Sequence, residues 1–294
     1  MHVTERSGIV TDRSRESASQ RWFEKPVREV RGQVFQRFVI RTHLVRRGER
    51  LERTLAPYLL DALEPGDIVV LGEKIVAIAE GRAVRLSSVK PRRLARFLSN
   101  HVRPLGYGIG FRRPETMEMA IREVGSLRIL LAAAGGAFDR FTRRSGDFYR
   151  IAGRRVAAID GPGPSTIPPY NQYIVLAPKH PEVVIAALAR RFGCGVAVVD
   201  VNDVGSEVLA ISKGLAPELI QELMRDNPMG QGAQGTPLAV LRPLDDVARV
   251  DHWPETLAPV AGGWPLPAGG LGDSTLRVLS GALADDHEGR AIDL

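Results

Sequence analysis

Short apolar runs recur along the chain and predict a set of buried strands. Residues 68–71, 173–176, 196–199 and 238–241 are apolar runs, and all of them except 173–176 are bounded on both sides by Gly, Pro or a charged residue. Such runs are typical of strands that are buried on both faces. Residues 34–42 alternate between apolar and polar side chains, which predicts a strand with one face in the core.

Helical spacing of apolar residues appears between these runs. It predicts helices over residues 55–62, 90–100, 114–134, 181–192 and 215–225. Pro114 and Glu115 suit the first turn of a helix, where proline is tolerated and an acid faces the positive end of the dipole. We expect Gly135 and Gly136 to interrupt that helix, and residues 149–159 to form a hairpin around Gly153.

The two ends of the chain differ in composition from the middle. Residues 1–20 are rich in Ser, Arg and Glu, which predicts disorder. Residues 245–294 are rich in Pro and Gly, with 9 acidic and 3 basic residues. We therefore divide the chain into an N-terminal arm (1–26), a folded domain (27–244) and an acidic C-terminal tail (245–294).

Composition and charge narrow the classes of function. The 294 residues are 44% hydrophobic and 25% charged, an ordinary globular mixture. No apolar run approaches the roughly 20 residues of a membrane span, the N-terminus lacks the apolar core of a secretory signal, and Cys194 is the single cysteine. These features predict a cytoplasmic protein without membrane contact.

The net charge of +6 combines −6 in residues 245–294 with +12 in the remainder. The basic excess is mostly arginine with few aromatic residues between, so a solvated surface is favoured over a nucleic-acid site. Attraction of small anionic ligands such as phosphates fits the same excess.

The strongest candidate for chemistry is the segment Asp200-Val201-Asn202-Asp203-Val204-Gly205, which ends the apolar run 195–199. Ligands gather at the carboxyl ends of strands in open α/β folds, and oxygen donors there suit Mg²⁺ or Mn²⁺. The alternative is a turn in which Asp and Asn cap their own backbone.

Two further segments have both a structural and a functional interpretation. Lys74, Glu80 and Arg82 follow a predicted strand, and form either a surface ion-pair set or a pair of cations that hold an anionic substrate. The Pro/Gly-rich loop 160–171 is either a plain surface loop or a nest of backbone N–H groups for an anion.

Two phosphate-binding motifs are excluded or disfavoured. Residues 230–235 match G-x-G-x-x-G, but they follow a predicted helix and precede a strand, which is the wrong context for a dinucleotide site. The sequence contains no P-loop motif.

Taken together, several segments resemble the coenzyme F-420 gamma-glutamyl ligase-like family. The resemblance rests on GDIVVLGEKIVAIAEGR (66–82), YIVLAPKHPE (173–182), VAVVDVNDVG (196–205), VLAISKG (208–214) and DNPMGQGAQGTPLAVLR (226–242). It implies an α+β fold of mixed sheets and flanking helices without a P-loop, in an intertwined homodimer. It also implies an amide ligase that uses GTP and Mg²⁺ or Mn²⁺ to join L-glutamate to a deazaflavin acceptor through an acyl phosphate.

The resemblance assigns roles to residues of this chain. Asp200 matches the family's metal-binding aspartate, and Lys74, Glu80 and Arg82 match its Lys…Glu-Gly-Arg segment. We predict Asp203, Asn202 and Asp160 as further metal ligands beside Asp200. Ser165, Thr166, Asn171, Gln231, Gln234 and Thr236 are the candidate nucleotide-binding residues. The family's metal-binding aspartate before Tyr173 has no counterpart in residues 165–171, so Asn171 or Asp160 would substitute.

We therefore carry three hypotheses of function. The first is a GTP- and metal-dependent ligase with a small anionic acceptor, such as a deazaflavin coenzyme. The second is a non-catalytic protein that retains the fold and binds a nucleotide or metabolite. The third is a basic module that binds RNA, for which binding would depend strongly on salt.

Overall fold

The structure is a computed structural model that describes residues 21–102, 110–142, 147–164, 166–202, 205–230 and 232–244. All of these residues belong to one compact unit, Met1–His252. Ser165, Asp203 and Gln231, three of the predicted site residues, lie outside the described residues, as do the predicted tail and residues 1–20 of the predicted arm.

Within the described residues, six strands form one mixed sheet in the order β1-β2-β8-β3-β6-β7. Only β3 and β6 are parallel neighbours in this sheet, and its other pairs are antiparallel. The predicted α+β class is therefore confirmed. The strands are β1 (Trp22–Val30), β2 (Gln33–Ile40), β3 (Ile68–Gly72), β6 (Gly195–Asn202), β7 (Gly205–Ile211) and β8 (Leu238–Pro243).

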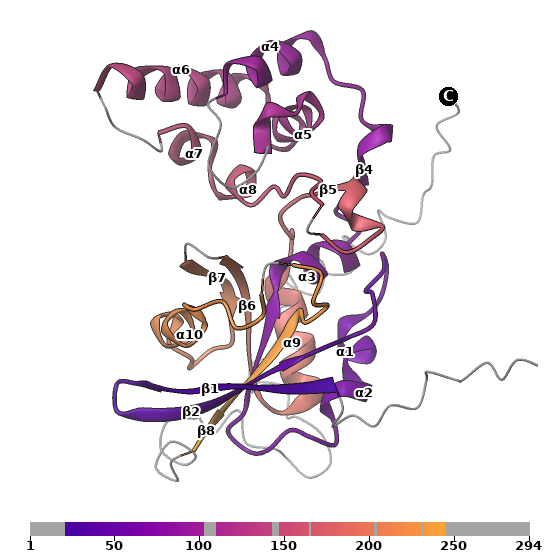
Figure 1. Ribbon diagram of the computed structural model, residues 1–294, viewed down its shortest axis with the longest axis vertical. Helices are drawn as coiled ribbons and strands as arrows, with labels where there is room; N and C mark the ends of the chain where they lie inside the picture. Colours follow the sequence, from indigo (N-terminus) through magenta and orange to yellow (C-terminus); the bar gives the residue numbers. More distant parts are fainter. Residues whose placement is uncertain are drawn as a thin grey trace, which may run out of the picture. The chain divides into compact units, whose positions relative to one another are not determined.

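Helices cover both faces of this sheet (Figure 1). On one face lie α1 (Leu51–Thr54), α2 (Ala56–Leu59) and α9 (Pro181–Phe192), and on the other lies α10 (Pro217–Met224). Because successive strand side chains point to opposite faces, a strand between two helical layers must be apolar at every position. The continuous runs of β3 and β6 meet this requirement, and their residues 68–71 and 196–199 are all at most 2% exposed.

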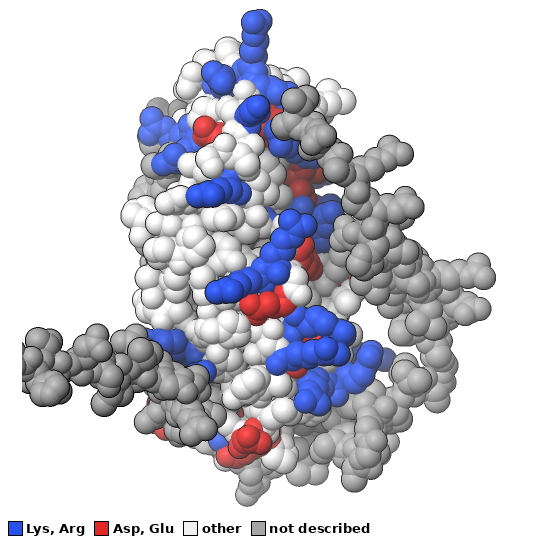
Figure 2. Space-filling view, turned by 90° about the vertical axis from the view of Figure 1, so that its right-hand side faces the viewer, with Lys and Arg blue, Asp and Glu red and all other residues white. Residues whose placement is uncertain are grey.

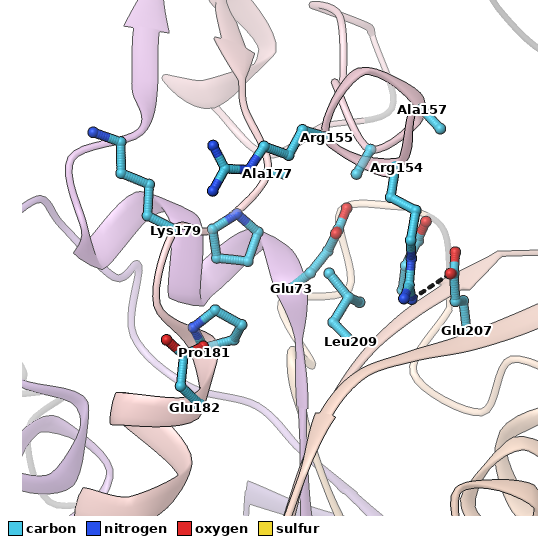
Figure 3. A pocket seen from close by; sticks show the side chains of 13 residues that line it. Glu73, Arg154, Arg155, Ala157, Ala177, Lys179, Pro181, Glu182, Glu207 and Leu209 are labelled. Atoms are coloured by element: carbon cyan, nitrogen blue, oxygen red, sulfur yellow. Dashed lines mark ion pairs between the residues drawn. The ribbon is translucent and has the colours of Figure 1, made fainter. Parts of the chain in front are cut away.

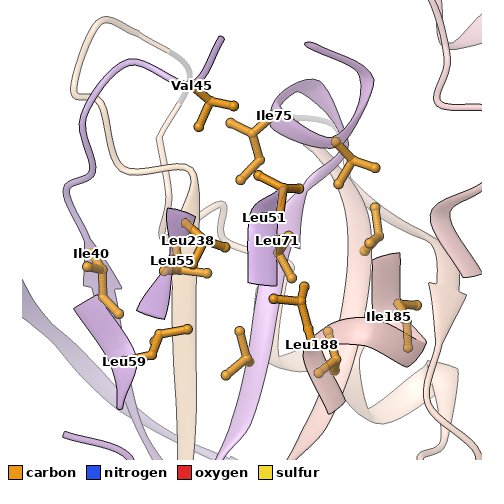
Figure 4. Close-up of a cluster of buried hydrophobic side chains, with 14 of the residues drawn as sticks. Ile40, Val45, Leu51, Leu55, Leu59, Leu71, Ile75, Ile185, Leu188 and Leu238 are labelled. Atoms are coloured by element: carbon orange, nitrogen blue, oxygen red, sulfur yellow. The ribbon is translucent and has the colours of Figure 1, made fainter. Parts of the chain in front are cut away.

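The main core lies between the sheet and the first helical layer (Figure 4). Leu55 between the two short helices, Leu59 of α2 and Leu188 of α9 belong to the same buried cluster as Leu71 and Leu238 of the strands. The sequence marks both ends of α9, because Pro181 occupies its first turn and Gly193, with φ +64°, follows its last residue. The predicted range of this helix is confirmed.

A second core is formed mainly by the helices that follow β4 (Ala83–Arg85) and precede β5 (Tyr173–Val175) in the sequence. These helices are α4 (Arg93–His101), α5 (Pro114–Val124), α6 (Ser126–Thr142), α7 (Asp147–Ala152) and α8 (Arg154–Ala157). Strands β4 and β5 pair with each other.

Three predictions for this region are wrong. The single helix predicted over residues 114–134 is two helices, α5 and α6, which are separated at Gly125 with φ +87°. Gly135 and Gly136 lie inside α6 rather than ending it, and residues 149–159 hold α7 and α8 rather than a hairpin. A Cβ atom on Gly135 would lie 2.5 Å from Ile151 Cδ1, and one on Gly136 would lie 3.3 Å from Phe148 Cβ. The two glycines therefore allow α7 to pack closely on α6, a use of glycine that local sequence does not distinguish from a helix stop.

Strand β1 was not predicted from the sequence, and it begins at Trp22, inside the range assigned to the N-terminal arm. It pairs with β2 along its length, but its side chains are mostly half-buried or exposed. A strand at the edge of a sheet lacks the continuous apolar run that identifies buried strands.

Among the described residues, no helix is long and apolar enough to cross a membrane. Figure 2 shows Lys and Arg side chains in several separate groups on the visible face, with Asp and Glu beside many of them. Charges of both signs are thus interspersed on this face.

Candidate functional site

The candidate site begins where two parallel strands end side by side. The register of β3 and β6 pairs Gly72 with Val199. The next residues along the two segments are Glu73, which begins the helix after β3, and Asp200, which is still on β6. After Gly72 the chain enters helix α3 (Glu73–Ala79), whereas β6 continues into a hairpin with β7. The geometry thus brings a carboxylate from each segment to the same end of the sheet.

A cavity of about 260 Å³ opens at this end of the sheet (Figure 3). Its walls come from the strand ends, from α8 and from the segment 177–182 that leads into α9. The carboxylate of Glu73 points toward α8, from which Arg154 and Arg155 extend. The charged residues that line the cavity are Glu73, Arg154, Arg155, Lys179, Glu182, Asp200 and Glu207.

Glu73 is the most buried of these charged residues. It is 8% exposed, and its Oε2 atom has no hydrogen-bond partner among the described residues. Burial, followed by the negative charges of Asp200 and Asp160, raises the pKa of Glu73 well above its usual value. A buried carboxylate oxygen without a partner is costly in a folded protein. A ligand that donates a hydrogen bond to this oxygen, or a cation that binds it, would reduce that cost.

Asp200 lies beside Glu73 and directly opposite Glu207 in the hairpin. Like charges in opposed positions of two strands repel each other. Burial, followed by the charges of Asp160 and Glu207, raises the pKa of Asp200 to about 6, although the Lys74 ammonium opposes this rise. The folded protein therefore holds this carboxylate at a cost in free energy at neutral pH.

Two cations neutralise two of the surrounding carboxylates. Lys74 Nζ lies 2.8 Å from Asp160 Oδ2, and Arg154 forms an ion pair with Glu207. Burial opposes the charged form of Lys74, but the carboxylates of Asp160, Glu73 and Asp200 outweigh it and raise the pKa of this residue. Backbone hydrogen bonds of 2.8 and 2.9 Å between residues 160 and 175 fix the position of Asp160.

Glu80 and Arg82 support one wall of the cavity from behind. Glu80 accepts hydrogen bonds from the backbone N–H groups of Lys179 and His180 at 2.6 and 3.0 Å. Arg82 donates to the Ala177 carbonyl at 2.9 Å and pairs with Glu123 at 2.8 Å. Both side chains thus hold the segment that lines the cavity, but neither of them lines it.

Gly81 between them has φ +76° and follows the end of α3. This left-handed conformation is typical of the residue that ends a helix, and it favours glycine.

The structure settles part of the question about residues 200–205. Asn202 Oδ1 accepts a hydrogen bond from the Gly205 N–H at 3.1 Å, so this side chain caps the hairpin turn as the turn interpretation expects. Asp200 lies before the turn, on the strand itself, and its side chain lines the cavity.

The predicted nucleotide-binding residues that are described do not line this cavity. Thr236 is buried and donates to the Met229 carbonyl at 2.7 Å, while Gln234 Oε1 accepts from the Gly232 N–H at 2.7 Å. Their loop reaches the same end of the sheet, because the Gly72 N–H donates to the Pro237 carbonyl.

Asn171 and Thr166 belong to the loop before β5. Asn171 Oδ1 is buried and has no hydrogen-bond partner within the described part of the chain. The Thr166 N–H donates to the Gly163 carbonyl at 3.2 Å, which closes a local turn.

The carboxylates that line the cavity would hold a divalent cation only if water or substrate phosphate completed its coordination shell. Across the described residues, no group of three or more His, Cys, Asp or Glu side chains is placed to hold a metal ion by itself. Mg²⁺ seldom needs such a cage, since it usually binds one or two carboxylates, waters and substrate phosphates. The donor set is all oxygen, and the unpartnered Glu73 Oε2 lies near Asp200, so the residues present fit this kind of site.

Sequence reasoning found Asp200, Asp160 and Lys74, which the structure brings together, but it missed Glu73, Arg154, Arg155 and Glu207. Glu73 could have been found by the argument used for Asp200, because it directly follows the apolar run of β3. The two arginines carried no signal, because residues 149–159 were predicted as a hairpin.

Comparison with known proteins is consistent with the resemblance noted in the sequence. A family model described as F420-0:Gamma-glutamyl ligase matches residues 39–209. This range contains both strand ends and every charged residue that lines the cavity. A search of curated proteins found no match.

Proposed function

The chain belongs to the F420-0:gamma-glutamyl ligase family, and from this premise we propose that it is a ligase that depends on GTP and a divalent metal. It joins the amine of L-glutamate, or of a similar amino acid, to a carboxylate of a small anionic acceptor such as a deazaflavin coenzyme. The observation that carries the proposal is the pair of carboxylates, Glu73 and Asp200, at the ends of two parallel strands in one cavity.

The proposed reaction has two steps. A carboxylate oxygen of the acceptor attacks the γ-phosphorus of GTP, which forms an acyl phosphate and releases GDP. The amine of glutamate then attacks the acyl carbon, inorganic phosphate leaves, and the amine loses a proton as the amide forms. Both steps gather negative charge on phosphate oxygens, so cations around the reacting groups stabilise the transition states.

The residues of this chain have distinct proposed roles. Asp200 and Asp160 hold the metal, Mg²⁺ or Mn²⁺, which when bound would neutralise phosphate oxygens. Lys74 supplies a fixed ammonium beside them, and Glu80 and Arg82 are positioning residues that hold the wall at residues 177–180.

Arg154 and Arg155 extend into the cavity from α8, with exposed fractions of 68% and 60% for their side chains. We assign them to the recognition of the acceptor's anionic groups, because arginine matches carboxylate and phosphate geometry. Further elements of the proposal are binding of GTP through the loops 165–171 and 230–236, and a homodimeric state.

The test measures GDP release and metal-dependent stability together. Purified protein is melted with Mn²⁺ and GTP, with Mn²⁺ and ATP, and with either component alone. A ligand at about 100 times its dissociation constant adds roughly 2.7 kcal/mol of stability. We expect the largest upward shift with Mn²⁺ and GTP, and continuous GDP release over many turnovers only when L-glutamate and a deazaflavin acceptor are both added.

Asp200→Asn serves as the matched control and should lose the metal-dependent part of the shift. A protein that shows no shift with any nucleotide, with or without Mn²⁺, would refute the proposal.

The alternative function, a non-catalytic protein that binds a nucleotide or metabolite, is favoured by one observation. Lys74 already pairs with Asp160, and this ammonium competes with a metal for the same carboxylate. Nucleotide binding without GDP release under every acceptor condition would support this alternative over the ligase.

A further inference from the structure

The charges around the cavity do not balance at its inner edge. Four carboxylates act on one another there: Glu73, Asp160, Asp200 and Glu207. Lys74 neutralises Asp160, and Arg154 neutralises Glu207. Glu73 and Asp200 have no ion pair within the described ranges, so these two carboxyl groups have no counter-cation of their own.

Glu73 shows a second, independent sign of a missing ligand. The residue is 8% exposed and lines the cavity, and its Oε2 atom accepts no hydrogen bond from any described residue. Water or protein donors normally satisfy such an atom. An orphaned carboxylate oxygen beside a second, half-buried carboxylate is a pair of hard oxygen donors, and divalent cations with two such protein ligands complete their shell with water and phosphate.

We propose that Glu73 is a protein ligand of the divalent cation and binds it together with Asp200. Glu73 therefore supplies a further donor that the predicted set, built on Asp200, Asn202, Asp203 and Asp160, did not include. The proposal rests on the proposed metal dependence but not on the identity of the acceptor.

The experiment is a titration of the full chain with Mn²⁺, followed by electron paramagnetic resonance, in which the sharp signal of free Mn²⁺ is lost on binding. Wild type, Glu73→Gln and Glu182→Gln are compared with Mn²⁺ alone and with Mn²⁺ and GDP. Glu182 is the matched control, because it lies at the rim of the same cavity with a side chain that is 66% exposed.

We expect Glu73→Gln to weaken Mn²⁺ binding at least about tenfold, the scale seen when groups that support a metal site are removed. Glu182→Gln should bind as wild type does. If wild type binds Mn²⁺ and Glu73→Gln binds it equally well, the role of Glu73 is refuted while the metal-dependent ligase stands. If wild type binds no Mn²⁺ in either condition, the metal dependence of the proposed function fails as well.

Two further measurements keep the outcome decisive. If Glu73→Gln does not fold, Glu73→Asp replaces it, since the shorter side chain keeps the charge but cannot reach the same position, and unchanged Mn²⁺ binding by that variant overturns the proposal. Titration with L-glutamate in metal-free buffer tests the other cation, an amino-acid ammonium. Weaker glutamate binding by Glu73→Gln with unchanged Mn²⁺ binding would overturn the metal assignment.

Discussion

Asp200→Asn should make the metal-free protein more stable at neutral pH, although it removes a residue of the proposed site. Burial and the neighbouring acids raise the pKa of Asp200 from 3.8 to about 6. Each pH unit of that difference corresponds to about 1.4 kcal/mol, so the charged form lowers stability by about 3 kcal/mol above pH 6. Asparagine has nearly the same shape, carries no charge, and removes this cost.

The pH dependence gives the sign of the effect. Below the unfolded pKa of 3.8 the carboxyl is protonated in both states and contributes nothing. As the pH rises toward 6 the unfolded chain releases its proton first, so the folded state loses stability, and above 6 the loss is complete. The variant should therefore exceed wild type by about 3 kcal/mol at pH 8 and by about 1 kcal/mol at pH 4.5.

Urea unfolding followed by circular dichroism, in buffer with a chelator, measures both differences. Asp61→Asn is the control, because Asp61 is exposed and such surface changes usually stay within about 0.5 kcal/mol. The reasoning is refuted if Asp200→Asn is no more stable than wild type at pH 8, or if its advantage is the same at both pH values. Added Mn²⁺ should narrow the difference at pH 8, because only wild type gains stability from binding, by roughly 2.7 kcal/mol at about 100 times the dissociation constant.

Three other predictions concern residues other than Glu73 and Asp200. Asp67→Ala should lower the free energy of unfolding by about 3–5 kcal/mol in urea, because Asp67 is fully buried and binds Arg242 through two hydrogen bonds of 2.9 and 2.7 Å. Glu64→Ala, whose side chain is 48% exposed, should cost about 1 kcal/mol or less, and equal losses would contradict the role of burial. Cys194 is 6% exposed, and burial raises the pKa of its thiol to about 12. A thiol reagent should therefore modify it only as the protein unfolds, and rapid modification of the native protein would refute this prediction. Glu80→Ala should cost about 1–3 kcal/mol in a thermal or urea melt, because it leaves two backbone N–H groups at the start of α9 without their acceptor, and unchanged stability would argue against this positioning role.

The buried strands and helix α9 could be predicted because the sequence patterns that identify them lie within the elements themselves. The runs 68–71 and 196–199 are apolar at every position, and the structure places helices on both faces of these strands. Helix α9 carries its own start and stop signals at Pro181 and Gly193. The family was predicted from segments whose spacing the match over residues 39–209 supports.

The errors fall where the meaning of a residue depends on a distant neighbour. Gly135 and Gly136 were predicted as a helix stop, but inside α6 they accept the close approach of Ile151 and Phe148 from α7. The sequence left Glu80 and Arg82 with either a structural or a substrate-binding role, and the hydrogen bonds by which they hold residues 177–180 reach nearly one hundred positions away in the sequence. A glycine or an acid has the same local pattern in either role.

For the candidate site, the sequence by itself determined the chemistry at each strand end: a Glu-Lys pair after β3, and an Asp-rich segment after the apolar run of β6. It determined these features because an apolar strand that breaks into charged residues is a local pattern. Only the tertiary structure decided that β3 and β6 are parallel neighbours with Gly72 beside Val199, and that the carboxylates meet two cations from other segments. Electrostatic interaction depends on distance in space rather than in sequence, so the fold, through its strand order, decided which carboxylates were left without a partner.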